Sequence, residues 1–202
     1  MAITEEFQRV PEPRQPLSNR QVDTIRGQHH RFVLIPIIQA HTRWFDAGPV
    51  SIGVEARALG TSAENMVRGP SIHVCSADHA REFIRFDVFG KVLHYHYVHN
   101  ADDTNTLWGY DPAVNGPMIP WAVAALRDRL PTMLRAAGAD ALAMEVEQSG
   151  WDASILAEVE REASAALAPR ADDLARAQEG MEWMQRWKQV HPQFNTVEEG
   201  DY

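Results

Sequence analysis

The sequence predicts an α+β fold: a curved antiparallel sheet or partial β-barrel over about residues 31–99, followed by C-terminal helices over about 120–190. Two observations support this prediction. Apolar and polar residues alternate with a period of two through the first half of the chain, and the apolar period becomes helical after Pro120. Strands that precede helices, rather than alternating with them, are typical of antiparallel α+β proteins.

The chain has 202 residues, which is enough for one well-buried core. Residues 1–29 are rich in Pro, Gln and Arg and show no period, so they are interpreted as an extended N-terminal arm. Residues 30–202 are interpreted as a single α+β domain.

Five segments have the pattern of strands. The first is nearly continuously apolar, and Pro36 inside it indicates an edge or a bulge. In the others, apolar residues such as Ile52 and Val54 alternate with polar ones, which places the two sets on opposite faces. The expected strands are 31–39, 50–57, 71–75, 82–89 and 92–99.

The dipeptide Gly90–Lys91 separates the last two expected strands, and a two-residue turn with glycine first is typical of a type II′ hairpin. Such a turn fixes the register of the strands. It places Asp87 opposite His94 and Arg85 opposite His96, with the paired Cβ atoms about 4.5–5.5 Å apart.

Residues 100–119 are interpreted as a long loop because they are full of Asn, Asp, Gly and Pro. This loop is a candidate lid in which Trp108 and Tyr110 close over a pocket.

Helices are expected from Pro120, with a kink or break at Pro131, and from an N-cap at Asp152 to about 168. A last helix is expected over 171–190. Its expected buried side chains are Leu174, Met181, Met184 and Trp187.

The net charge of -9 and the pI of about 5.4 argue against nucleic acid and anionic membrane surfaces as partners. Cys75 is the only cysteine, so no disulfide forms within the chain. The N-terminus lacks the apolar segment of a secretory signal, and the longest apolar run, 32–38, is too short to span a bilayer. These features predict a cytoplasmic protein.

One face of the predicted sheet carries an unusual number of titratable side chains. Polar and ionisable groups in this number suit a wet pocket or open solvent better than a packed core. The residues are Glu55, Arg57, His73, Cys75, Arg85, Asp87, His94 and His96.

The leading hypothesis is a metal-dependent enzyme. His94 and His96 project to the same side of a strand and are expected to bind one ion, with His73 and either Glu55 or Asp87 completing the set. Neutral imidazoles with a carboxylate suit Zn, Fe, Mn, Ni or Cu. A small anionic substrate would then be held by guanidinium groups, which pair bidentately with carboxylates. The candidates for this role are Arg57 and Arg85.

This ligand set resembles in kind that of the cupins, which also place His-x-His on a strand. The resemblance implies a barrel with a metal centre. A cupin has a glutamate a few residues after the histidine pair, whereas here Asn100 to Thr104 offer only Asp102 and Asp103, and the glycine spacing also differs.

Three alternatives remain open. In a metal-free lyase or isomerase, Asp87 would orient His94 and His94 would transfer a proton. In a non-catalytic ligand-binding or dimerisation module, Trp183 and Trp187 of the last helix would serve a homodimer. An exposed face of an antiparallel sheet is also normally polar without any function.

Overall fold

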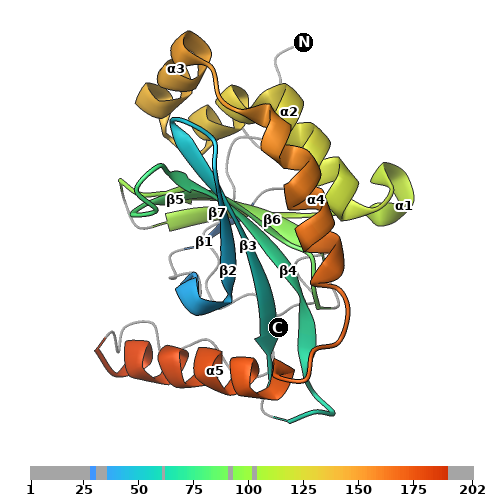
Figure 1. Ribbon diagram of the computed structural model, residues 1–202. Helices are drawn as coiled ribbons and strands as arrows, with labels where there is room; N and C mark the ends of the chain where they lie inside the picture. The colour runs from blue at the N-terminus through green and yellow to red at the C-terminus, as the bar shows by residue number, and fades with distance from the viewer. Residues whose placement is uncertain (1–27, 31–35, 61, 91–92, 102–103, 191–202) are drawn as a thin grey trace, which may run out of the picture.

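The computed structural model describes residues 28–30, 36–60, 62–90, 93–101 and 104–190. The fold is α+β, with one seven-stranded antiparallel sheet in the order β1-β7-β6-β5-β4-β3-β2 (Figure 1). The sheet is open and does not close into a barrel, because β1 and β2 lie at opposite edges. The strands are β1 (Gln28–His30), β2 (Thr42–Asp46), β3 (Val50–Leu59), β4 (Val67–Ser76), β5 (Glu82–Asp87), β6 (His94–His99) and β7 (Thr104–Gly109).

The helices follow the strands. A single-turn 3-10 helix, η3 (Gln39–His41), precedes β2, and a second, η4 (Ala153–Ile155), precedes α4. The α-helices are α1 (Pro112–Asn115), α2 (Met118–Ala136), α3 (Asp140–Ser149), α4 (Leu156–Ala165) and α5 (Asp173–Val190). Among the described helices, none is both long and apolar enough to cross a membrane.

The main core lies between one face of the sheet and helices α2 and α4. Alternate residues of the central strands, such as Ile72 and Phe86, are fully buried there against Leu126 and Leu130 of α2. A smaller apolar cluster forms at the end of β3, where Leu59 and Phe89 contact α5. In Figure 1, α5 lies across that end of β3, away from α2 and α4.

The hairpin register predicted from Gly90 is confirmed. Asp87 pairs with His94 and Arg85 with His96. Gly90 has φ +78°, a conformation that glycine adopts without strain. Four titratable side chains therefore lie in two neighbouring cross-strand pairs, although β5 ends at Asp87, two residues before the expected end, and β6 begins at His94.

Three sequence predictions of secondary structure differ from the structure in whole or in part. The expected loop 100–119 contains strand β7 and helix α1, because the apolar residues between its turn residues pair with β6. Residues 36–38 lie outside any strand and Gln39–His41 is helical, while the rest of the expected strand, 31–35, lies outside the described residues. The chain stays helical from Met118 through Pro131 to Ala136, so of the predicted kink or break at Pro131, the break is absent.

Two further differences concern the helical region. Helix α3 was not expected between α2 and the Asp152 cap, although that cap is confirmed, since the Asp152 side chain accepts from the Ser154 amide. Leu174 is 41% exposed instead of buried. Met181 and Trp183 pack partly buried against the Leu59–Phe89 cluster, whereas the side chains of Met184 and Trp187 lie outside what the structure describes.

Candidate functional site

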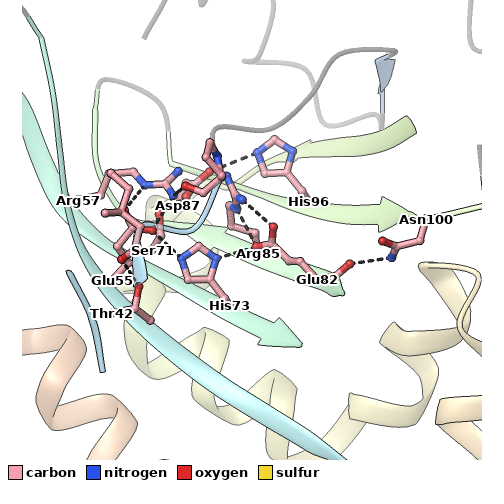
Figure 2. A network of polar contacts seen from close by, with 12 residues as sticks. Thr42, Glu55, Arg57, Ser71, His73, Glu82, Arg85, Asp87, His96 and Asn100 are labelled. Carbon is pink, nitrogen blue, oxygen red and sulfur yellow. Dashed lines mark hydrogen bonds and ion pairs between the residues drawn. The ribbon is translucent and has the colours of Figure 1, made fainter. Parts of the chain in front are cut away.

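The sheet face opposite the main core carries most of the predicted titratable residues in two neighbouring cross-strand rows. In one row His73, Arg85 and His96 pair across β4, β5 and β6. In the next row, two residues along, Glu55, Ser71, Asp87 and His94 pair across β3 to β6. Figure 2 shows most of these side chains converging over the sheet.

Asp87, His94 and His96 form one group within these rows. Asp87 Oδ2 lies 3.4 Å from His94 Nε2 and 3.3 Å from His96 Nε2, and the two imidazole rings are edge-to-face with centroids 5.0 Å apart. Each residue offers one ligand atom, and these atoms all lie within 4.8 Å of one another. The side chain of His94 is 20% exposed, whereas Asp87 and His96 are almost fully buried, so the group opens to solvent at His94.

Two buried side chains, those of Ser71 and Asn105, support this group through contacts with Asp87 and His96. Ser71 Oγ donates a hydrogen bond to Asp87 Oδ1, which leaves Oδ2 to face the imidazoles. Asn105 of β7 is 1% exposed, and its Oδ1 lies 2.9 Å from His96 Nδ1. Support of this kind fixes the orientation of a carboxylate and of an imidazole before any ligand binds.

The charges around the triad favour an ionised carboxylate and a neutral imidazole. Burial raises the pKa of Asp87, but the close contacts with His94 and His96 and the charge of nearby Arg85 outweigh it and hold this pKa well below its usual value. Burial lowers the pKa of His96, and the positive charges of His94 and Arg85 lower it further against the opposing effect of Asp87. A carboxylate beside a neutral imidazole is the donor set that divalent transition metals prefer.

A third imidazole, that of His73, lies between two glutamates. Its Nδ1 is 2.6 Å from Glu82 Oε1, and its Nε2 is 3.3 Å from Glu55 Oε2 (Figure 2). Each glutamate is also paired bidentately with an arginine, Glu55 with Arg57 and Glu82 with Arg85. The result is a continuous buried chain of alternating acidic and basic groups.

The two arginines determine the ionisation of these glutamates. Burial raises the pKa of Glu55, yet the charge of Arg57 and the contact with His73 bring it down to about 2. Glu82 behaves in the same way toward Arg85 and His73, and its pKa is also about 2. The pKa of Arg85 is raised in return by Glu82, despite the opposing effect of burial. These four groups therefore stay charged and neutralise one another.

The predicted ligand set is thus divided by the structure. Asp87, His94 and His96 are brought together, but His73 and Glu55 belong to the neighbouring charge chain. His73 lies two strands from His96 with Arg85 between them, a separation of about 9.5 Å at ordinary strand spacing. The prediction that His73 and Glu55 share one metal site with His94 and His96 is therefore wrong.

The predicted roles of the aromatic and basic residues also change. Trp108 pairs with Tyr95, which packs against the main core, and Tyr110 is buried in that core beside Trp121. Both therefore lie on the helix-covered face and cannot close over His94 as a lid. Arg57 is occupied by Glu55 and by the carbonyl oxygen of Pro36.

Sequence reasoning missed Glu82, Ser71 and Asn105. By strict alternation, Glu82 would share a face with Ile84, but a bulge shifts the register so that Cys75 pairs with Glu82 while Val74 still pairs with Ile84. Asn105 lay in the segment interpreted as a loop. Ser71 lies two residues before His73 on β4 and so shares its face, and its small polar side chain among titratable neighbours was the available signal.

The chain belongs to the family described as Domain of unknown function (DUF7700), whose model matches residues 44–163. The match covers more than half of the chain and includes the Asp87–His94–His96 group together with Ser71 and Asn105; helix α5 lies outside it. The chain matches no curated protein and no solved structure.

Proposed function

We propose that this protein is a metal-dependent enzyme whose divalent metal is held by Asp87 Oδ2, His94 Nε2 and His96 Nε2. The observation that carries the proposal is the distance from Asp87 Oδ2 to each of the two imidazole nitrogens. Ligand atoms about 2.0–2.1 Å from a tetrahedral zinc lie about 3.3–3.4 Å from one another. The carboxylate oxygen lies 3.3 and 3.4 Å from the two imidazole nitrogens, longer than the about 2.7–2.9 Å of a charge-assisted hydrogen bond.

The donor set narrows the choice of metal. Two imidazoles and one carboxylate suit Zn, Fe, Mn or Ni better than Mg or Ca, which prefer oxygen ligands. Three protein ligands leave positions for water and substrate, as in catalytic rather than structural sites. A metal bound there would act as a Lewis acid or lower the pKa of a bound water.

The substrate we propose is a small polar molecule that approaches from the side of His94, the most exposed of the three ligands. Of the two arginines expected to bind an anionic group, Arg85 lies nearer the triad, because it pairs across the sheet with His96 and lies two residues from Asp87. Glu82 pairs with its Nε and Nη2 and balances its charge, so an anionic substrate stays a prediction. Arg57 is less suited to this role, since Glu55 and Pro36 occupy it.

The proposed location is the cytoplasm. The only cysteine, Cys75, is fully buried, and burial raises its thiol pKa, so it is an unreactive core residue rather than a redox centre. A homodimer formed through the last helix stays a prediction; Trp183, one of the two tryptophans assigned to it, packs within the chain near Leu59.

A second candidate function is supported by the same geometry. Asp87 lies 3.4 Å from His94, which is partly exposed, so this pair could hold and transfer a proton without a metal. This arrangement would define a lyase or isomerase that uses general acid–base catalysis.

Metal analysis of the untagged protein separates the two candidates. We expect close to one equivalent of metal in the parent protein and in a His41→Ala control, and none in a His94→Ala/His96→Ala double variant. His41 lies in η3 and pairs with Glu179, away from the triad. Circular dichroism would confirm that the variants fold. A parent protein that contains no metal, and takes up none of Zn, Mn, Fe or Ni, would contradict the metal centre and favour the Asp87–His94 pair.

A further inference from the structure

We infer that Asn105 is a positioning residue that selects the tautomer of His96 and thereby reserves Nε2 for a metal cation. The inference rests on the proposed metal centre and adds how a neighbouring side chain orients one of its ligands before the metal binds. It concerns a residue on β7, a strand that contributes no ligand atom to the group of Asp87, His94 and His96.

The contact between Asn105 and His96 fixes one proton. Asn105 Oδ1 lies 2.9 Å from His96 Nδ1. An amide oxygen accepts hydrogen bonds and cannot donate, so Nδ1 carries the hydrogen. A neutral imidazole has one donor and one acceptor nitrogen, so Nε2 is left with a lone pair.

That lone pair faces another acceptor. His96 Nε2 lies 3.3 Å from Asp87 Oδ2, and an ionised carboxylate has only acceptor sites. The other oxygen of Asp87 already receives the hydrogen bond of Ser71, so this carboxylate is held with Oδ2 toward the ring. His96 Nε2 and Asp87 Oδ2 therefore point toward one buried position, which a metal cation held by both atoms would occupy.

The neighbouring imidazole differs in its contacts. Both nitrogens of His73 face carboxylate oxygens, of Glu82 and Glu55, and each of these carboxylates is already paired with an arginine. In contrast, His96 faces one amide oxygen and one carboxylate oxygen, so only its Nε2 is directed at an acidic group.

The test compares Asn105→Leu with Asn105→Asp, because aspartate keeps an acceptor at the same position and leucine does not. Asn115→Leu is the matched control, since Asn115 lies on α1 and its amide bonds only a local backbone oxygen among the described contacts. The probes are Zn²⁺ and Co²⁺, with the visible absorption of bound Co²⁺ as the signature of the site. Nitrogen NMR of the metal-free protein reports the tautomer of His96 independently.

We expect Asn105→Leu to bind both ions about 10- to 100-fold more weakly than the parent protein and to alter the Co²⁺ spectrum. Asn105→Asp should restore most of the affinity, and Asn115→Leu should leave it unchanged. The metal-free parent should show His96 protonated on Nδ1.

Two results would overturn the inference: metal affinity in Asn105→Leu equal to that of the parent, or a His96 protonated on Nε2 in the metal-free parent. A parent that shows the Nδ1 tautomer but binds neither ion would overturn the metal centre and still support the tautomer assignment, so the two failures are distinguishable. Circular dichroism of Asn105→Leu would show whether weaker binding reflects lost folding, and the NMR measurement on the parent does not depend on that variant.

Discussion

Two buried imidazole–carboxylate groups lie side by side on one face of the sheet, and they differ in which cations surround them. In the group around His73, each carboxylate is paired bidentately with an arginine. In the group around His96, Asp87 receives a hydrogen bond from Ser71 and faces two imidazoles, and none of its described hydrogen bonds comes from an arginine. A cluster of histidines and acids therefore suits a metal better where its carboxylates are not already paired with arginines.

The comparison also separates stability from function. A buried arginine–glutamate pair costs desolvation energy, and it is strongly destabilising to break because it leaves an unpaired charge. A partly open ligand set contributes little to folding until its ion binds. We expect the charge chain to determine stability and the triad to determine metal binding.

The largest effect should come from breaking the charge chain. Arg85→Met removes the partner of Glu82, which has a side chain only 12% exposed, and we expect a loss of about 3–5 kcal/mol in the free energy of unfolding. Urea denaturation would measure it. Arg135→Met is the matched control, because Arg135 and Glu147 form an exposed bidentate pair and should matter far less. Equal losses in the two variants would show that burial of the pair is not decisive.

Acid should weaken the same chain. The pKa of Glu55 in the folded protein is about 2, below its ordinary value of 4.5. Because the folded pKa is depressed, the stabilisation is present above pH 4.5 and is lost as the pH falls from 4.5 toward 2, by a total on the order of 3 kcal/mol. Thermal unfolding at a series of pH values would show the decline. A stability that stays constant between pH 5 and pH 3 would refute it.

Metal should stabilise the protein through the triad alone. At a free Zn²⁺ concentration 100 times the Kd, we expect an increase of about 2.7 kcal/mol in the free energy of unfolding. His94→Ala should abolish this increase, whereas His41→Ala should keep it. The rise in Tm on adding Zn²⁺ is the measurement, and an equal rise in His94→Ala would place the bound ion elsewhere.

The smallest effect should come from His94 in the absence of metal. Its side chain is 20% exposed, so His94→Gln should change the free energy of unfolding by less than about 0.5 kcal/mol. His73→Gln, at a fully buried position between two acids, should cost about 1–3 kcal/mol. Chelator-treated protein in urea would compare them, and the reverse order would contradict the roles assigned to the two groups.

Much of the fold and part of the site followed from local patterns. The alternation in β3 and β4 identified the core face, and Gly90 fixed the register that brings Asp87 to His94. The prediction failed where the secondary structure depends on contacts between segments that are distant in the sequence. Residues Thr104–Gly109 form a strand by pairing with β6, although the segment around them is rich in turn residues. Helix α2 likewise continues through Pro131, where the sequence predicted a kink or break.

The sequence by itself determined the two-faced sheet and the cross-strand pairs of β5 with β6, because side-chain direction alternates along a strand and the short connection around Gly90 allows few registers. The tertiary structure alone decided which titratable groups act together. The bulge opposite Val74 and Cys75 placed Glu82 beside His73 and Arg85, and β7 placed Asn105 behind His96. Partners of this kind come from distant segments, and their selection depends on three-dimensional packing, which no local pattern encodes.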